Sequence, residues 1–392
     1  STMRRQLVLL PILFGFFVMG FADIISTALI RIEEECRLSA FAAAVLPLMI
    51  FVWFLLISIP TGILCGKIGR KNTVLASLAL TVAAMFLPFA ATAERWWIYA
   101  VSFAFLGIGN TMIQAALPAL MSNVVPQEKL TARISLGQFV KALCAAATPV
   151  VALFCAERLG NWKYLFLVYG ALTFVAAAWL ALSPIPRERA SAAPPSFASC
   201  VRQLASPYIL AMVVGVFFSV AADLGFAVGV PEYLRDVFRL PTDKAATGPA
   251  VYFLAKMLAA FAGSIVFARI SAARCFPWSV GLAVGATAGL FFAPNPTVFL
   301  VLVFLSSFGF ANTFGMCMGL AINHRPERTN EISALVVMAI SGGGLVKIAF
   351  GALRGSLGPA GIVWTLLACL VYLLALGVFA TRSLKGTAGG RP

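Results

Sequence analysis

The sequence has few charged residues for its length. Only 11% of its 392 residues are Asp, Glu, Lys or Arg, whereas an average soluble domain has roughly a quarter. It also has a single histidine, and its eight cysteines lack the spacing of metal ligands or of a disulfide framework. A phosphate-binding loop and a pattern of nucleophile with base are missing too. These absences argue against an enzyme or an ATP-driven pump, and we expect neither a metal nor a cofactor.

Long apolar runs make up most of the sequence. Hydrophobic residues make up 61% of the chain, and runs long enough to cross about 30 Å of hydrocarbon, roughly 20 residues each, recur along its length. The pattern predicts an all-α membrane protein with twelve transmembrane helices. The twelve predicted spans are residues 7–30, 41–65, 73–93, 97–122, 134–156, 164–184, 207–230, 247–270, 278–293, 297–322, 333–353 and 362–381.

A long polar connection after the sixth span divides the chain. It reads PIPRERASAAPPSFASCVRQLAS and is rich in proline, serine and charge. We therefore predict two pseudo-symmetric six-helix halves. The predicted limits are residues 1–185 for the first half, 186–206 for a cytoplasmic linker, 207–381 for the second half and 382–392 for a tail.

The distribution of positive charge predicts how the chain lies in the membrane, because short cytoplasmic loops carry an excess of Lys and Arg. With both termini and the linker inside, 17 of the 29 Lys and Arg lie on the inner side, nine on the outer side and three within spans. We therefore predict cytoplasmic termini and a multi-pass protein of the inner membrane. The net charge of +15 reflects this orientation, so we expect membrane lipids as partners and no nucleic acid.

One predicted inner loop contains a recognisable motif. Residues 62–72 read GILCGKIGRKN, which resembles the G-x-x-x-D-R-x-G-R-K loop of the major facilitator superfamily of transporters. Here Gly66 replaces the Asp and Lys67 the first Arg, and a fainter echo, GSIVFARISAAR, occupies residues 263–274. The resemblance implies the fold of that superfamily, with two six-helix halves. Without the Asp, we do not expect its usual inner charge latch.

Two further stretches are similar to the fucose/proton symporter family of sugar transporters. They are residues 108–143, IGNTMIQAALPALMSNVVPQEKLTARISLGQFVKAL, and the Gly-rich residues 336–351, VVMAISGGGLVKIAFG. This resemblance implies a sugar substrate and proton coupling. Family members carry their coupling acids in helices 1 and 4, where this sequence has Thr27 and Ile113. The proton carrier therefore cannot be copied directly from the family.

Five ionisable residues lie within predicted spans, where such groups usually face a cavity or a partner because an unpaired charge is costly. They are Asp23, Lys141, Asp223, Lys256 and Lys347. The two aspartates occupy equivalent first helices of the two halves, as internal pseudo-symmetry would place functional groups. We predict that the aspartates couple protons and that Lys141 and Lys347 contact the substrate.

Lys141 has two alternative explanations. Its long side chain could snorkel to the inner headgroups, roughly 10 Å away at 1.5 Å per residue, or it could form an ion pair inside the protein. Lys256, about nine residues from the outer end of its span, is ambiguous in the same way.

Uncharged polar and aromatic residues complete the predicted substrate site. Amides both donate and accept hydrogen bonds, which suits sugar hydroxyls, and an aromatic ring can stack on a sugar face. The predicted binding residues of these kinds are Asn110, Gln114, Gln138, Asn312 and Trp53, with Phe226 and Tyr252 as further aromatic candidates. The alternative for each amide is a hydrogen bond between helices, and the alternative for each ring is packing.

The predicted function is secondary active transport of a small polar solute, and not catalysis. We expect a monomer that takes up a sugar together with protons and exposes its site alternately to the two sides of the membrane. Two alternatives stay open. An anionic solute such as a sugar acid is favoured by the surplus of lysines within spans, whereas multidrug efflux would need a wider apolar cavity.

Overall fold

The structure is a computed structural model that describes residues 2–188, 193–245, 247–343, 352–353 and 355–388. Contacts within the chain divide it into two compact units. Unit 1 comprises Ser1–Pro126, Val140–Gln203 and Arg325–Ser341, and unit 2 comprises Gln127–Phe139, Leu204–His324 and Gly342–Pro392. The limits of the two six-helix halves stay a prediction.

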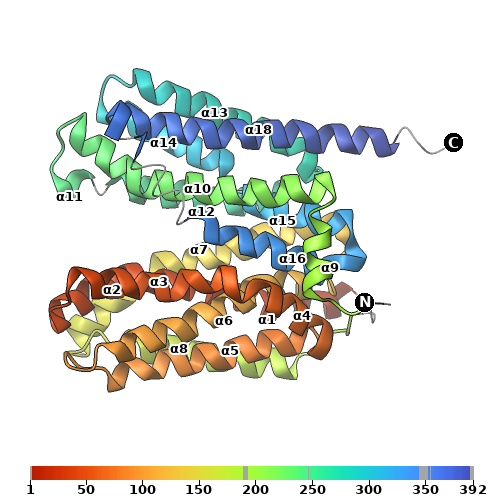
Figure 1. Cartoon of the computed structure of the whole chain (residues 1–392), viewed down its shortest axis with the longest axis horizontal. Coiled ribbons are helices and arrows are strands. Elements are labelled where there is room, and N and C mark those ends of the chain that lie inside the picture. The colour runs from red at the N-terminus through yellow and green to blue at the C-terminus, as the bar shows by residue number, and fades with distance from the viewer. Residues whose placement is uncertain (1, 189–192, 246, 344–351, 354, 389–392) are drawn as a thin grey trace. The chain divides into compact units, whose positions relative to one another are not determined.

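Unit 1 is a bundle of helices that lie side by side (Figure 1). In chain order its helices are α1 (Thr2–Met19), η1 (Gly20–Asp23), α2 (Ile24–Cys36), α3 (Ala40–Leu56), α4 (Ser58–Ile68), α5 (Arg70–Phe86), η2 (Leu87–Ala90), α6 (Trp97–Met121), α8 (Tyr164–Leu182), α9 (Phe197–Gln203), η4 (Pro326–Arg328) and α16 (Thr329–Met338). The long helix α7 (Gln127–Arg158) begins in unit 2 and continues into unit 1 at Val140. Helix α6 is the centre of unit 1, because α1, α3, α4, α5 and α16 all pack on it.

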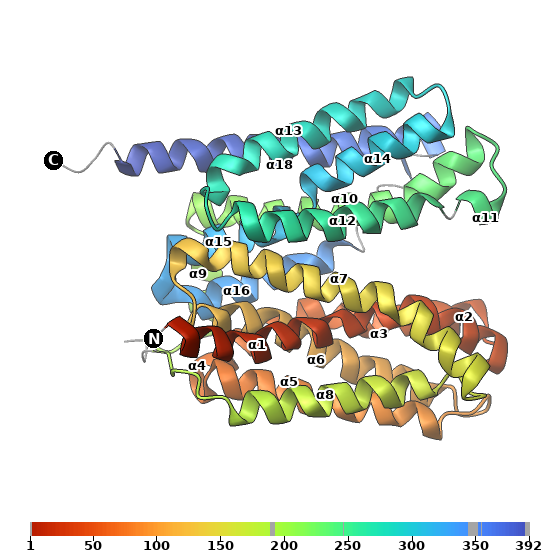
Figure 2. The ribbon, with the colours of Figure 1, turned by 180° about the vertical axis from the view of Figure 1, so that it is seen from behind.

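Unit 2 is also a helical bundle. Its helices are α10 (Pro207–Asp236), α11 (Thr242–Ala245), α12 (Thr247–Val266), α13 (Ala272–Gly289), η3 (Leu290–Phe292), α14 (Pro296–Phe310), α15 (Thr313–His324) and α18 (Ala360–Ala388), while η5 (Ala339–Gly342) crosses the unit boundary. Helices α13 and α18 run alongside each other, as Figures 1 and 2 both show. Helix α10 contacts α12, α14, α15 and α18, and it therefore holds the unit together.

The apolar runs of the sequence form the expected long helices. Among the described residues, nine helices are long and apolar enough to cross a membrane, or up to eleven if each of two bent helix pairs counts as one span. These helices correspond to eleven of the twelve predicted spans. The remaining span, residues 333–353, lies partly outside the described residues, so the number twelve stays a prediction.

Both bent pairs have identifiable positions and, in one case, a clear cause. The second span bends by 56° between α3 and α4. Pro60 lies on the first turn of α4. It has no N–H to donate to the carbonyl of Leu56, and its ring would clash with that carbonyl, so α3 cannot continue straight into α4. The first span bends by 40° where the short 3₁₀ segment η1 separates α1 from α2. Backbone that is not α-helical at this depth requires partners within the protein.

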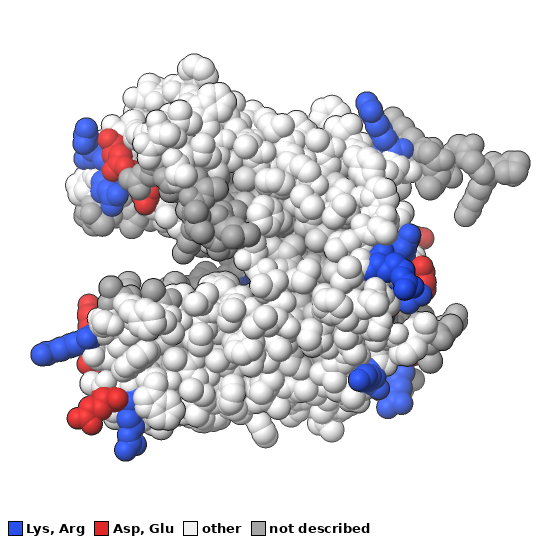
Figure 3. All heavy atoms as spheres, in the orientation of Figure 1, with Lys and Arg blue, Asp and Glu red and all other residues white. Residues whose placement is uncertain are grey.

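Charged side chains gather near the helix ends of each unit on the face that Figure 3 shows, and the long sides of the bundles are uncharged there. Large hydrophobic side chains are exposed on these sides, for example Phe174 at 66% in unit 1 and Trp278 at 84% in unit 2. An uncharged band with exposed apolar residues is the surface that lipid requires. The arrangement therefore agrees with a multi-pass membrane protein.

Candidate functional site

The break in the first span is held by a buried amide. Asn110 of α6 is 2% exposed, and its Nδ2 donates a hydrogen bond to the carbonyl of Met19, the last residue of α1, at 2.8 Å. Gln114, one turn further along α6, donates from Nε2 to Oδ1 of Asn110 at 2.8 Å. The structure thus brings two predicted binding residues together. Asn110 makes the interhelical hydrogen bond that was its alternative, whereas the hydrogen bond of Gln114 lies within α6. Their contact with a substrate stays a prediction.

Asp23 ends the 3₁₀ segment beside this amide pair, and α7 packs closely against the same segment. A Cβ atom on Gly20 would lie 2.8 Å from the carbonyl oxygen of Lys141 and 2.8 Å from Cβ of Cys144, so only glycine allows this approach. Asp23 and Lys141 are both charged neighbours of Cys144. The first span and α7 therefore place a carboxylate and an ammonium group in one region of unit 1.

Lys141 lies on the interior face of α7. The positions three and seven residues further on, Cys144 and Thr148, are buried, and the exposed positions of this part of the helix are Leu143, Val150 and Leu153. Residues three, four and seven apart share a helix face, so the half-buried side chain of Lys141 does not start from the lipid-exposed face. This position favours an internal partner or a substrate over snorkelling, although the role itself stays a prediction.

Trp53 lies on the last turn of α3, just before the bend of the second span. Its Nε1 is buried and has no hydrogen-bond partner among the described residues. A buried indole N–H usually has an acceptor, and this one has none among the described residues. Contact between Trp53 and the substrate stays a prediction.

In unit 2 the structure joins an acid, a base and a phenol. Lys256 Nζ of α12 lies 2.6 Å from Oδ1 of Asp223 on α10. The hydroxyl of Tyr252, one turn before Lys256, donates to the same oxygen. We call Asp223, Tyr252 and Lys256 the acid–lysine cluster. The structure therefore places the ambiguous Lys256 in an ion pair with Asp223, a predicted proton-coupling residue.

Two aromatic candidates form packing contacts beside this cluster. Phe226 and Tyr252 are fully buried, and their rings stack with centroids 5.6 Å apart, while Phe226 also stacks on Phe310 at 5.3 Å. These rings hold α10, α12 and α14 together. Their buried faces correspond to the packing alternative, and the hydroxyl of Tyr252 is the polar handle that reaches Asp223.

A second amide, half-buried, lies at a helix break in unit 2. Asn312 lies between α14 and α15, and its Nδ2 donates to the carbonyl of Ala259 on α12 at 2.8 Å. Next to it, the hydroxyls of Thr313 and Ser219 lie 2.6 Å apart. Asn312 therefore fixes α12 to this break in the way that Asn110 fixes α1 to α6.

Two predicted binding residues are less informative. Gln138 lies half-buried in the part of α7 that belongs to unit 2. Lys347 lies outside the described residues. The roles of both residues in binding stay predictions.

The motif loop of residues 62–72 forms a polar hub in unit 1 around Arg70, which is 8% exposed. The guanidinium donates to Oδ1 of Asn330 on α16 at 2.8 Å and to Oδ1 of Asn123 at 2.6 Å. It also donates to Ser122 Oγ and to the Ala119 carbonyl, both at 3.1 Å. Five donors in a planar fork make Arg suited to such a hub.

The carboxylate of this hub comes from the linker. Glu188 accepts from the backbone N–H of Arg70 at 2.7 Å and from Nδ2 of Asn123 at 3.0 Å. The motif position that is Asp in the superfamily is Gly66 here, and a Cβ atom on Gly66 would collide with the ring of Pro195 in the same linker. The linker thus occupies the space of the missing Asp side chain and supplies a different acid.

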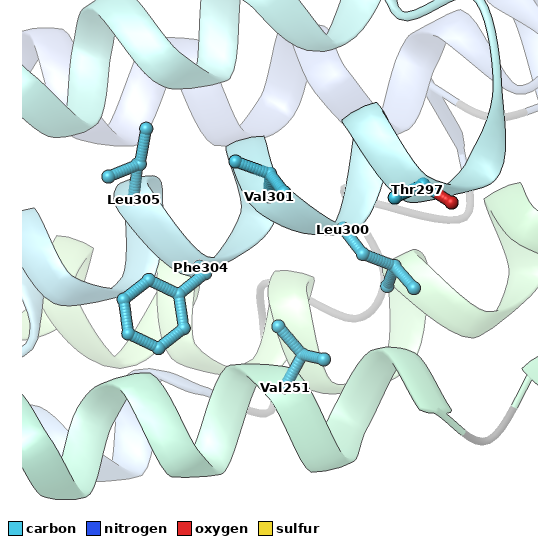
Figure 4. Close-up of a pocket in the computed structure, with 6 residues that line it drawn as sticks. All are labelled: Val251, Thr297, Leu300, Val301, Phe304 and Leu305. Atoms are coloured by element: carbon cyan, nitrogen blue, oxygen red, sulfur yellow. The ribbon is translucent and has the colours of Figure 1, made fainter.

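A hollow on unit 2 is separate from these residues. Six side chains of α12 and α14 line a hollow of about 330 Å³: Val251, Thr297, Leu300, Val301, Phe304 and Leu305. Figure 4 shows that its lining is apolar except for Thr297. Val301 is 54% exposed, so this hollow belongs to the outer surface of the bundle and contains no predicted site residue.

Sequence reasoning missed the partners of several charged residues. The pairing of Lys256 with Asp223 and the roles of Glu188 and Asn330 were not predicted. The sequence held a partial signal for the Lys256–Asp223 pair, because Tyr252 and Lys256 are one turn apart and present two polar groups on one helix face. The depth of α12 relative to α10, which decides the pairing, has no signature in a single sequence.

Comparisons with known proteins agree with this architecture. A glucose/galactose transporter of Brucella abortus is 22% identical over 389 residues, covering 94% of this chain and 92% of that protein. The structure of the fucose:proton symporter of E. coli, FucP, matches with a TM-score of 0.83 at 19% identity, covering 95% of this chain and 98% of that one. A bacterial homologue of the iron transporter ferroportin matches with a TM-score of 0.77 at 16% identity, covering 97% and 99%.

These structural likenesses, all below 20% identity, establish the fold and not the substrate. The sequence profile of the Major Facilitator Superfamily matches residues 12–348, which is most of the chain. The helical bundles and the breaks in their spans agree with that match. The chain therefore belongs to the Major Facilitator Superfamily, a family of membrane transporters and not of enzymes.

Proposed function

We propose that the protein takes up a sugar together with protons, by exposing one binding site alternately to the two sides of the membrane. The observation that carries this proposal is the broken first span: Asp23 ends η1, and at the other end of η1 Asn110 of α6, itself bonded by Gln114, holds the last carbonyl of α1. In secondary transporters, substrate and ion sites are typically built at such discontinuous helices near the middle of the membrane. The similarity to a glucose/galactose transporter and to a fucose:proton symporter supports a sugar.

The two aspartates are the proposed proton carriers. Each lies in the first helical span of its half of the sequence, and an intramembrane carboxylate that gains and loses a proton can drive solute uptake. Asp23 is exposed on η1, and Asp223 belongs to the acid–lysine cluster.

The test is transport by the purified protein in liposomes, with labelled D-glucose, D-galactose and L-fucose as probes. We expect an acidic exterior to drive accumulation of at least one of these sugars. Asp23→Asn should abolish this accumulation but leave exchange of labelled for unlabelled sugar partly intact, because exchange requires no net proton movement. Asp236→Asn, at a helix end beside Arg235, is the matched control. Normal accumulation in both Asp23→Asn and Asp223→Asn would remove proton carriage from these residues.

Orientation and oligomeric state are part of the same proposal. The bias of Lys and Arg places both termini and the linker in the cytoplasm of the inner membrane, and each transport pathway belongs to one monomer. Protease should cleave the linker at residues 191–199 only when it is added to the cytoplasmic side. Cleavage from the outside alone would reverse the orientation.

The choice of substrate class has one competing candidate with its own observation. Lysines at positions 141 and 256 add positive charge within the spans, and Lys256 is only partly covered. This charge favours an anionic solute such as a sugar acid over a neutral sugar. A thermal-shift screen with neutral sugars, sugar acids and amphipathic drugs separates the classes, and stabilisation by the drugs alone would indicate efflux.

A further inference from the structure

We propose that the acid–lysine cluster of unit 2 is a protonation-gated binding site for the carboxylate of a sugar acid. In this site Asp223 occupies the place of the substrate carboxylate on Lys256 until Asp223 takes up a proton. The inference rests on the proposed function, because it assigns the substrate class and the coupling residue of the same transporter.

The cluster has unused hydrogen-bonding capacity. An ammonium group has three donors, and Asp223 Oδ1 is the one acceptor that the described residues offer to Lys256 Nζ, at 2.6 Å. Tyr252 donates to that same oxygen. Two donors of Lys256 are therefore available to a second, external carboxylate.

The pair is reachable but does not face lipid. The side chains of Asp223 and Lys256 are each 35% exposed. On α12, Lys256 shares a face with the buried residues Tyr252 and Ala259, whereas the exposed positions Leu254 and Phe261 lie on the opposite face. The exposed part of the pair thus belongs to the interior side of the helix, where a polar solute would arrive.

Charge balance links the substrate to a proton. If an external carboxylate binds Lys256 and displaces Asp223, the displaced carboxylate loses its counter-ion within a predicted membrane span, which is unfavourable. Protonation of Asp223 removes that cost, because the neutral acid needs no counter-ion and can donate to a neighbouring oxygen. One proton therefore enters with each carboxylate, and the step adds no net charge to the site.

The groups around Asp223 do not offer another acid for this role. The titratable side chains that contact it among the described residues are Tyr252 and Lys256 of α12. Helices α14 and α15 contribute Phe310 and Thr313, and Tyr372 of α18 binds the Ala211 carbonyl three turns away. Helix α11 also packs on α10; its Lys244 is exposed, and the side chain of its Asp243 lies outside the described part of the structure. Lys347, also of unit 2, lies outside the described residues.

The direction of the pH dependence follows from the linkage. Above the range in which Asp223 protonates, each bound carboxylate must bring one proton, so affinity should fall about ten-fold for each unit of rising pH. A neutral sugar does not compete with Asp223, and its affinity should not depend on this proton.

The test compares uronates with the matching hexoses on purified full-length protein. D-Glucuronate and D-galacturonate differ from D-glucose and D-galactose in having a carboxylate at C6, so each pair isolates that group. Calorimetry at pH 5.5 and 7.5, in buffers of different ionisation enthalpy, measures both affinity and proton uptake. We expect one uronate to bind at least ten-fold more tightly than its hexose at pH 5.5, with uptake of about one proton at pH 7.5.

Variants assign these effects to the cluster. Asp223→Asn should keep uronate binding but abolish proton uptake and the pH dependence, because Lys256 is then permanently available. Lys256→Met should weaken uronate binding at least ten-fold, and the double variant Asp223→Asn/Lys256→Met, which leaves no buried lone charge, should show the same loss. The control is Lys244→Met, at an exposed lysine of α11 in the same unit.

The outcomes separate this inference from the proposed function. Hexose binding that exceeds uronate binding, or uronate binding that survives in the double variant, would overturn the cluster as a carboxylate site while sugar transport stands. Proton uptake that persists in Asp223→Asn would overturn the gating by Asp223. Binding of neither kind of sugar would overturn both.

Discussion

The two units hold the polar side chains near their helix breaks in different ways. In unit 1 a neutral amide, Asn110, holds the end of α1 and is itself held by Gln114. In unit 2 a neutral amide, Asn312, holds α12, but an ion pair between Asp223 and Lys256 lies nearby. Neutral hydrogen bonds between helices mainly fix structure, whereas an ion pair that can exchange partners can also carry substrate and protons. The comparison indicates that amides position the broken span of unit 1, while unit 2 has an ion pair whose lysine could bind another carboxylate.

A further difference lies at the end of unit 1 where α16 and the linker meet the motif loop. Arg70, Glu188 and Asn330 come from three separate segments of the sequence, and they form one hub. The hub shows that an acid outside the motif can replace the motif Asp, because Glu188 reaches the same loop from the linker.

The largest expected effect tests this hub. Arg70→Met removes a buried guanidinium that serves four acceptors, and we expect a loss of unfolding free energy on the order of 3–5 kcal/mol. Unfolding by SDS in mixed micelles measures it. Lys67→Met, at an exposed residue of the same loop, is the control. Equal stability of the two variants would show that the hub is dispensable.

The next prediction asks whether Lys141 of unit 1 also has a substrate role. If it binds an anionic substrate, Lys141→Met should weaken binding by about 1.5–3 kcal/mol, roughly ten- to a hundred-fold in Kd. Calorimetry with the uronates measures this, and Lys129→Met, at an exposed position of α7, is the control. Rescue of Lys141→Met by Asp23→Asn would instead identify an internal ion pair. Unchanged binding and transport would mean that Lys141 snorkels to the lipid headgroups. The acid–lysine cluster of unit 2 would then be the one charged binding site proposed.

A third prediction concerns the contact between the linker and the motif loop. Gly66→Asp restores the acid of the superfamily motif, but its side chain meets the ring of Pro195. Overpacking of this kind costs about 1–3 kcal/mol, measured by the same SDS titration. The double variant Gly66→Asp/Pro195→Ala should recover part of the loss, since the ring atoms are gone. An equally stable single variant would mean that the linker moves aside freely.

The smallest effect compares the two amides directly. Asn110→Ala and Asn312→Ala each remove one hydrogen bond to a carbonyl within the membrane, and such bonds average about 0.6 kcal/mol with a maximum of about 1.7. We expect Asn110→Ala to cost more, because it also leaves Gln114 without its acceptor. Asn72→Ala, at an exposed amide on the first turn of α5 that donates to the carbonyl of Ile68 at the end of α4, serves as the control. A larger cost for Asn312→Ala would reverse the proposed contrast between the units.

The sequence by itself determined the class of protein and the position of most spans. Apolar runs of about 20 residues have one stable outcome in lipid, a helix whose backbone groups bond to one another. The motif loop and the two longer similar stretches predicted the superfamily, which the profile match over residues 12–348 confirms. The intramembrane charges were also visible, because a Lys or Asp among apolar residues stands out in any reading.

Only the tertiary structure decided which of those charges meet. Asp223 and Lys256 lie 33 positions apart in the chain, and their contact depends on how α10 and α12 slide and rotate against each other. The same holds for Arg70, whose partner Glu188 lies 118 positions away in the chain and whose partner Asn330 lies 260 positions away. Periodicity fixes which face of a helix a residue occupies, but the partner on the next helix is set by packing. For that reason the predicted site residues were found as single polar positions, and the acid–lysine cluster became visible only when the helices were packed together.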